Sequence, residues 1–240
     1  MRTLNVPKTA PKLSYTTFNM THSPSPTIAP LGDSALLVRF GTTLSDEANL
    51  AAIAFARRLG ERVPDGVTEI DPNLVSVLLR YDPDRTDATR LAGEVRLITS
   101  LDTETAPVTS TTYNVPVTFG GEDGPDLDEV AQTLNLSPKD FIAAHNASPM
   151  RVLTTGFAPG FVYCGFHAPA LHLPRRLNVR ARVPAGTVLF AAGQTAITST
   201  AIPTGWHVIG RTDFSNFDAN HNPPTRLREG DTILFSAVHP

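Results

Sequence analysis

Arginine is concentrated in one stretch of this sequence, and that stretch contains no carboxylate. Between Phe141 and Thr212 there are six arginines and four of the seven histidines but no Asp or Glu, although the whole chain has a net charge of -3. Clustered guanidinium groups repel one another unless an anion lies among them. The stretch is therefore predicted to bind an anion or an acidic partner surface; the simpler alternative is a β-rich segment that exposes its arginines.

The spacing of these arginines suggests how they could act together. Arg176, Arg180 and Arg182 alternate with Pro and apolar residues, so at least two of them are expected on one face of an extended segment. Guanidinium groups bind carboxylate or phosphate through paired hydrogen bonds. The alternative is that they pair with acids of the N-terminal part of the chain. Arg211 follows Gly210 at a predicted strand end, from which its side chain can enter a pocket mouth.

Aromatic and amide side chains in the same stretch suit a small ring that carries an amide. Gln194 offers hydrogen bonds and Trp206, the only tryptophan, offers a stacking surface, although Trp206 could equally pack in the core. A tight turn is predicted at residues 159–160 between Phe157 and Phe161, and it brings backbone N–H groups and two rings together. The alternative is a turn fixed by two core aromatics.

Several other chemistries are not supported. No Gly-Lys dipeptide exists, hence no P-loop, and Lys139 is the only lysine beyond residue 12, which disfavours a Schiff base. His167 and His172 lie without neighbouring carboxylates, so no metal site is predicted. The single Cys164 excludes an internal disulfide, fits a reducing compartment, and is expected to be a core thiol rather than a nucleophile.

The elements that must position these residues fall into an N-terminal and a C-terminal group. Residues 1–30, rich in Thr, Ser and Pro, are predicted to be a disordered tail. Residues 31–119 show the order β-α-β-β-α-β that is typical of a ferredoxin-like α+β domain. Its strands are predicted at 34–40, 67–70, 74–81 and 112–119, and its helices at 45–59 and 86–101.

Residues 120–240 are predicted to form a β-barrel domain, entered through short helices at 127–134 and 138–146. Arg151, just ahead of its first strand, is expected to tolerate replacement by Lys. No run of 18 apolar residues occurs, so no membrane span is expected. The acidic chain and the low lysine content of the basic stretch argue against nucleic-acid binding.

Motifs from about Pro30 to the C-terminus resemble one bacterial family in order and spacing. The family is known as allophanate hydrolase subunit 1, KipI or 5-oxoprolinase subunit PxpB, a carboxyltransferase-domain subunit. The matching residues are 120–127 (GGEDGPDL), His145, 156–163 (GFAPGFVY), 174–176 (PRR), 180–186 (RARVPAG), 205–212 (GWHVIGRT) and 230–231 (GD). The resemblance implies a cyclophilin-like C-terminal barrel and a PxpC-type partner (allophanate hydrolase subunit 2).

Residue chemistry and resemblance together give one set of candidate residues for substrate or anion binding, and no catalytic residue is assigned. The set is His145, Phe157, Pro159, Gly160, Phe161, Arg176, Arg180, Arg182, Gln194, Trp206 and Arg211. Four nearby positions depart from the family pattern. Ala196, Thr198 and Ser199 stand where the family usually has Gly, Tyr and Pro, and Thr204 replaces a Gly. These departures leave the substrate open.

An anion-suited face without a complete catalytic set resembles half of an active site. The main hypothesis is a cytoplasmic subunit of an ATP-dependent 5-oxoprolinase, which opens the 5-oxoproline lactam to glutamate and is inactive alone. A PxpC-type subunit is the expected partner, with a LamB/YcsF-type PxpA subunit as a further candidate, and the complex would bind the ATP that activates the lactam carbonyl. One alternative is a carboxyltransferase half-subunit of a urea carboxylase or allophanate-type system, which would use biotin. The other is a non-enzymatic KipI-like histidine-kinase inhibitor.

Overall fold

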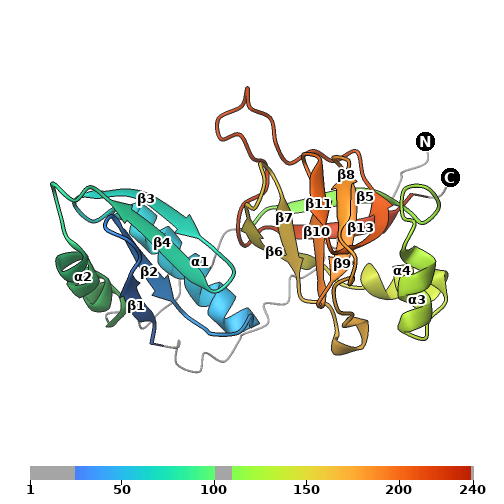
Figure 1. Ribbon diagram of the computed structural model, residues 1–240, viewed down its shortest axis with the longest axis horizontal. Helices are drawn as coiled ribbons and strands as arrows, with labels where there is room; N and C mark the ends of the chain where they lie inside the picture. The colour runs from blue at the N-terminus through green and yellow to red at the C-terminus, as the bar shows by residue number, and fades with distance from the viewer. Residues whose placement is uncertain (1–24, 101–109, 239–240) are drawn as a thin grey trace, which may run out of the picture.

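The N-terminal part of the chain is an antiparallel sheet with both helices packed on one face. The computed structural model describes residues 25–100 and 110–238 (Figure 1). The sheet has the order β1-β2-β4-β3. Its inward residues Leu36, Val38, Val77 and Leu79 share one buried cluster with residues of both helices. The elements are β1 Thr27–Pro30, β2 Ala35–Arg39, α1 Asp46–Glu61, β3 Val67–Pro72, β4 Ser76–Tyr81 and α2 Ala88–Ser100.

The strand predicted to close this sheet belongs elsewhere. β5 (Thr112–Phe119) pairs with strands of the C-terminal barrel, so the prediction that it completes a ferredoxin-like sheet is wrong. The edge beside β2 is taken instead by β1, from Thr27↔Arg39 to Pro30↔Leu36. Only four residues separate these two strands, so their pairing closes a short loop at small entropic cost.

Two predicted boundaries change with this finding. Residues 27–30, assigned to the disordered tail, form a strand, while residues 1–24 lie outside the described part of the chain. The first barrel strand begins at Thr112, ahead of the boundary predicted at residue 120. The sequence pattern predicts that β5 is a strand but does not predict which strands pair with it. The reason is that β5 alternates polar and apolar residues as any half-buried strand does.

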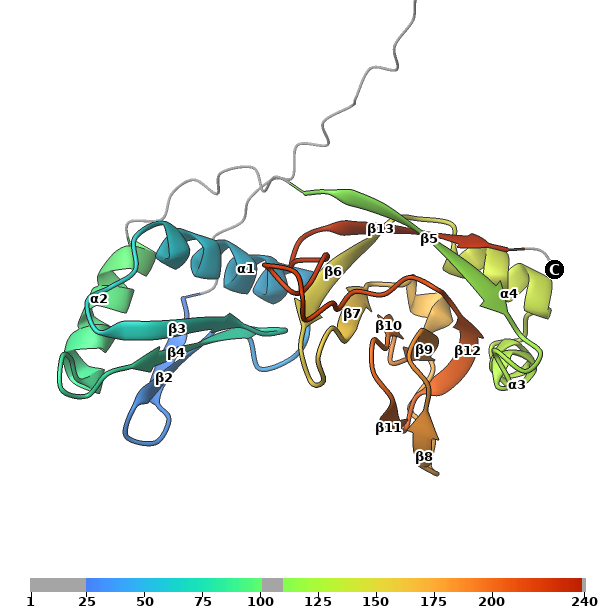
Figure 2. The ribbon, with the colours of Figure 1, turned by 90° about the horizontal axis from the view of Figure 1, so that it is seen from above.

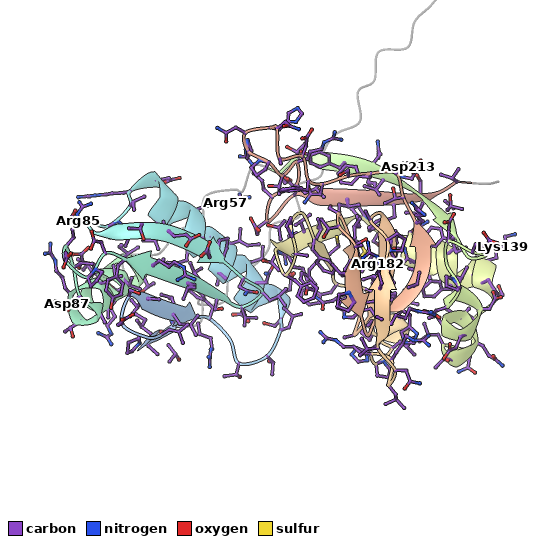
Figure 3. The ribbon with its side chains drawn as sticks, turned by 45° about the horizontal axis from the view of Figure 1, so that its top comes forward. Arg57, Arg85, Asp87, Lys139, Arg182 and Asp213 are labelled. Carbon is purple, nitrogen blue, oxygen red and sulfur yellow. The ribbon has the colours of Figure 1, made fainter. Side chains whose placement is uncertain are left out.

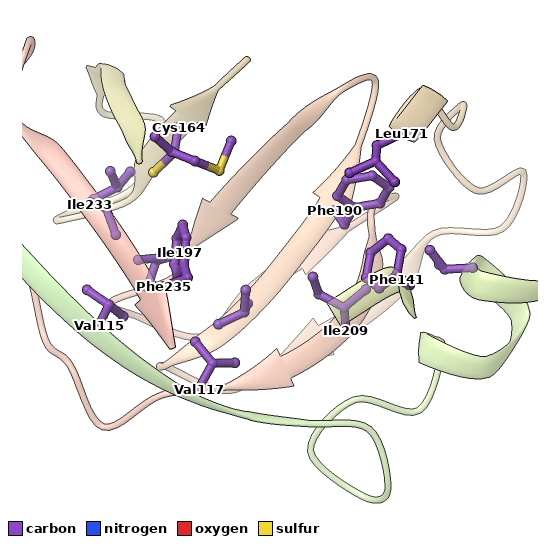
Figure 4. Close-up of a cluster of buried hydrophobic side chains, with 14 of the residues drawn as sticks. Val115, Val117, Phe141, Cys164, Leu171, Phe190, Ile197, Ile209, Ile233 and Phe235 are labelled. Atoms are coloured by element: carbon purple, nitrogen blue, oxygen red, sulfur yellow. The ribbon is translucent and has the colours of Figure 1, made fainter. Parts of the chain in front are cut away.

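The C-terminal part is a closed seven-stranded barrel in the order β10-β7-β6-β13-β5-β12-β9, as the predicted β-barrel requires. The closed form fits the cyclophilin-like barrel that the family resemblance implies. Its core is filled from all sides, with Phe141 of α4 and Phe190 of β9 in edge-to-face contact at 5.2 Å between ring centroids (Figure 4). The strands are β6 Met150–Thr155, β7 Val162–Gly165, β9 Thr187–Ala191, β10 Gln194–Ile197, β12 His207–Arg211 and β13 Thr232–Ala237.

Three helical pieces and one ribbon are attached to the barrel. The helices are α3 Leu127–Thr133, α4 Pro138–His145 and the 3-10 turn η1 Pro169–Leu171. β8 (Arg180–Val183) and β11 (Ile202–Thr204) pair only with each other, and they project from the barrel on the side away from β5 and β13 (Figure 2). Among the helices in residues 25–100 and 110–238, none combines the length and apolar character needed to cross a membrane.

The two parts of the chain meet through a buried asparagine. Asn49 of α1 donates to the carbonyls of Leu74 (2.8 Å) and Leu153 (2.9 Å), and its Oδ1 accepts from Arg151. Arg151 also pairs with Asp46. These contacts do not fit the expectation that Arg151 is a neutral position. Arg151 extends from β6 toward the N-terminus of α1, where Asp46 lies in the first helical turn.

Replacing Asn49 with Ala is expected to lower the free energy of unfolding by about 1–3 kcal/mol, because two buried carbonyls lose their donors. Urea unfolding monitored by the fluorescence of Trp206 measures this loss. The matched control is Asn178→Ala, at an exposed position of the barrel, which should unfold like the parent. Equal stability of both variants would show that Asn49 does not join the two parts.

Candidate functional site

Arg176 and Arg180 converge on one buried carboxylate, Asp126. Nη1 of Arg176 lies 2.7 Å from Oδ1 of Asp126, and Nη2 of Arg180 donates to the same oxygen. Glu129 lies 3.5 Å from Arg176 at the surface. The Asp126 side chain is 4% exposed, against 22% and 35% for the two arginines. The arginines thus pair with an acid, but this acid follows β5 and does not belong to the N-terminal part of the chain, where the alternative had expected it.

The position of Asp126 is fixed by a tight turn packed on β12. Its N–H donates to the carbonyl of Val208 (3.0 Å), and its Oδ2 accepts from the Val208 N–H (2.8 Å). A Cβ at Gly124, two residues earlier, would lie 2.2 Å from the Ile209 carbonyl oxygen. Only glycine lets the turn approach β12 this closely. Both oxygens of Asp126 are occupied, and with Glu129 beside Arg176 the two arginines are balanced by two carboxylates.

Beside this cluster, aromatic side chains form a continuous row on the outer face of the barrel. The ring centroids of Phe157 and Phe161 lie 5.5 Å apart, those of Phe161 and Tyr163 4.7 Å, and those of Tyr163 and Trp206 5.9 Å. The guanidinium of Arg175 caps the row at 5.6 Å from the Trp206 ring. Burial raises the pKa of the Tyr163 phenol, and the nearby Arg175 opposes this shift. Phe161 and Trp206 are buried in one apolar cluster, as the core-packing alternative for Trp206 expected, while Tyr163 is partly buried and Phe157 is exposed.

Gln194 lies on the same outer face with an unused donor. Alternate residues of a strand share a face, so Gln194 lies on the same face of β10 as Ala196. Ala196 is the pairing partner of Tyr163 and packs in one cluster with Trp206. The Gln194 side chain is buried, and its Nε2 has no hydrogen-bond partner among the described residues. An unpaired buried amide is unfavourable. A ligand carbonyl that reached it would remove that penalty.

The predicted turn at Pro159 and Gly160 supports the start of the aromatic row. Gly160 has φ +70°, and a Cβ there would lie 2.5 Å from the Cβ of Phe217. Its carbonyl accepts from Ser199 Oγ (2.8 Å) and Asn216 Nδ2 (3.2 Å). The turn is thus pinned by polar contacts rather than by two core rings, because Phe161 is buried while Phe157 is 72% exposed.

Each of the four residues that depart from the family pattern contacts other residues of the barrel part. Ser199 holds the Gly160 carbonyl, and Thr198 donates to the Pro184 carbonyl (2.8 Å). Thr204 Oγ1 accepts from the Trp206 N–H (3.0 Å), and Ala196 packs under the aromatic row. These residues shape the outer face without adding a charge to it.

His145 lies inside the barrel, away from the outer face. Its Nε2 lies 2.8 Å from Thr195 Oγ1, which also lies 2.8 Å from Nε2 of His167, and the two imidazole centroids are 4.7 Å apart. Burial lowers the pKa of His145 to about 4, although its contact with Asn146 opposes this. Burial and the neighbouring His145 lower the pKa of His167 to about 3. Both rings are therefore neutral at pH 7.

Two predicted arginines stand apart from the cluster. Arg182 is exposed on β8, with no ion pair among the described residues, and it shares a strand face with Arg180 two residues earlier (Figure 3). Arg211 is exposed at the end of β12 and lines a separate cleft of about 350 Å³ with Asp123 and Asp213. The structure thus groups Arg176 and Arg180 but does not bring Arg211 to them.

Sequence reasoning missed several residues of this region. Asp126 stands in the GGEDGPDL motif, but nothing in its spacing from Arg176 reveals a contact across 50 residues. Tyr163 could have been found from its place in the GFAPGFVY motif, one strand alternation beyond Phe161. No group of three or more His, Cys, Asp or Glu side chains suited to a metal occurs in the described residues. Burial raises the pKa of the Cys164 thiol, which disfavours the nucleophilic thiolate.

Comparison with known proteins places the chain in a family. The profile of the carboxyltransferase domain, subdomain C and D, matches residues 26–227. The Bacillus subtilis (strain 168) protein named as the B subunit of 5-oxoprolinase is 34% identical over 223 residues, which are 88% of this chain and 92% of that protein.

Solved structures agree with this assignment. The crystal structure of TTHA0988 is 33% identical with a TM-score of 0.74, over 87% of this chain but only 40% of that longer chain. The Kluyveromyces lactis urea carboxylase shares the fold, with a TM-score of 0.73 at 17% identity over 93% of this chain and 23% of that one. The chain thus belongs to the carboxyltransferase-domain family that includes the 5-oxoprolinase B subunits.

Proposed function

We propose that this protein is the B-type subunit of a 5-oxoprolinase and opens the 5-oxoproline lactam to glutamate together with a PxpC-type partner. The observation that carries the proposal is the match to the 5-oxoprolinase B subunit of Bacillus subtilis over 92% of that protein's length. The family match over residues 26–227 supports it. A LamB/YcsF-type PxpA subunit is a further proposed partner.

The outer face of the barrel suits the two polar ends of 5-oxoproline, a small ring with a lactam and a carboxylate. The flat ring is proposed to lie against Tyr163, the partly buried ring next to Trp206. Nε2 of Gln194 would donate to the lactam oxygen, where negative charge increases as the carbonyl is attacked. The substrate carboxylate would lie toward Arg175, whose guanidinium caps the aromatic row.

The residues of this chain do not by themselves fit the triphosphate of ATP. The two grouped arginines already bind Asp126, and Lys139 lies exposed on α4 at the end of the molecule away from the N-terminal sheet (Figure 3). Among the described residues of this face, no phosphate site built on backbone N–H groups and a lysine is found. We therefore propose that the nucleotide is bound by the complex and assign no step of ATP chemistry to this chain.

Reconstitution tests the proposed function. The isolated chain is expected to release no glutamate from 5-oxoproline with ATP, because its face binds substrate without a nucleotide site or a catalytic base. Addition of the PxpC-type and PxpA-type subunits should give ATP-dependent turnover, measured by coupled glutamate detection. Turnover by this chain alone would contradict the proposal.

Two controls separate the proposal from the alternatives. In the reconstituted complex Gln194→Leu should lower kcat, whereas Arg96→Lys, at an exposed position on α2, should leave kcat and KM unchanged. Avidin inhibits reactions that pass through carboxybiotin. Inhibition of turnover by avidin would favour the carboxyltransferase alternative instead.

A further inference from the structure

An exposed apolar loop leads into the projecting ribbon of β8 and β11. Among the large apolar side chains of the described residues, Leu177 is the most exposed, at 101%, and Val179 is 68% exposed. Both belong to residues 174–182, which we call the arginine loop. A single exposed leucine is ordinary, but two on one short loop beside a projecting ribbon form a candidate contact surface.

The arginine loop is held in place from both sides of these two residues. The Arg176 N–H donates to the Gly205 carbonyl (2.8 Å), and the Arg176 and Arg180 side chains both bind Asp126. Leu177 and Val179 lie between these anchors. The loop is therefore anchored by the fold on both sides of the two exposed residues.

The charge around the loop indicates what covers it. Arg175 and Arg182 are exposed at its two ends, and the exposed Glu129 of α3 lies 3.5 Å from Arg176. Asp126, the nearby buried acid, is already bound by two arginines. An apolar centre flanked by exposed cations is complementary to a partner surface with an apolar pocket and an acidic rim.

We propose that Leu177 and Val179 of the arginine loop dock into an apolar pocket of the PxpC-type partner, whose rim supplies Asp and Glu side chains to Arg182. This assignment rests on the proposed function, because that function supplies the partner. In the assembled enzyme the docking would cover the projecting ribbon and Arg175 of the loop, whose guanidinium lies 5.6 Å from the Trp206 ring.

The test is the affinity of the complex after the apolar centre is made acidic. The double variant Leu177→Asp, Val179→Asp should bind the purified PxpC-type subunit at least about 30-fold more weakly, since residues in the apolar centre of an interface dominate its binding energy. Its melting temperature should match the parent, because both side chains are exposed. Leu97→Asp on α2, 60% exposed, is the matched control and should bind normally.

A charge reversal gives an independent reading. Arg182→Glu should slow association and reduce its dependence on salt, because rim charges act mainly on the association rate. Normal binding by the double variant would overturn the docking assignment while leaving the proposed function standing. Failure of the parent chain to bind the PxpC-type subunit would overturn both. A parent chain that forms a dimer, lost in the double variant, would identify a second copy as the occupant and overturn the partner assigned here.

Discussion

Replacing Asp126 with Ala is expected to lower the free energy of unfolding by about 2–4 kcal/mol. The variant leaves the guanidiniums of Arg176 and Arg180 and the Val208 N–H without their shared acceptor. Removal of one partner from a buried ion pair typically costs about 3–5 kcal/mol. The value is smaller here because both arginines are partly exposed to water. Urea unfolding at pH 7 measures the loss.

Two further variants and one exchange measurement show which contacts of Asp126 cause the loss of stability. Asp126→Asn keeps an acceptor for the Val208 N–H but removes the charge, so it isolates the ion pairs from the backbone contact. Glu129→Gln is the matched control, because Glu129 is 65% exposed and its pair with Arg176 should contribute little. Hydrogen exchange of the Arg176 N–H, which donates to the Gly205 carbonyl, should accelerate in Asp126→Ala, since the side-chain anchors of the arginine loop are lost. An unchanged unfolding free energy in Asp126→Ala would show that the cluster is not structural.

The order of elements could be read from the sequence, whereas the pairing of distant strands could not. The helix N-cap at Ser45 follows from local chemistry, and its Oγ accepts from the Ala48 N–H as expected of a cap. β5 shows the limit, because its eight residues read as a strand in either part of the chain. Its parallel partner β13 lies more than one hundred residues away, and no local pattern encodes that choice.

In the candidate site, too, contacts within a local motif could be predicted from the sequence, whereas contacts between distant residues could not. The turn at residues 159–160 and the aromatic residues around it form a local motif, so their proximity could be predicted. The basic stretch suggested an anion site, but the acid that binds Arg176 and Arg180 lies outside it, in the turn after β5. Charge segregation along the sequence therefore did not mean charge segregation in space. His145 was misplaced because the sequence does not show that α4 ends inside the barrel.

Acidification is expected to destabilise the barrel through His145 and His167. Their pKa values fall from 6.5 to about 4 and about 3 in the folded chain, because burial disfavours the charged ring. The unfolded chain therefore binds protons more readily than the folded one. The stability held by the neutral rings is complete above pH 6.5 and is lost as the pH falls toward 4. For His145 alone the full loss is roughly 3 kcal/mol.

Two measurements check this pH dependence, one on the rings and one on stability. In NMR spectra the ring protons of His145 and His167 should not titrate between pH 8 and 5. Urea unfolding should show a free energy that falls steadily from pH 7 to 5. His145→Gln should flatten this slope, because glutamine cannot take up the proton, while His221→Gln at the exposed Asp218 pair should not. Titration of both buried rings near pH 6.5 would contradict this assignment, since two charged rings 4.7 Å apart in the barrel core would repel each other.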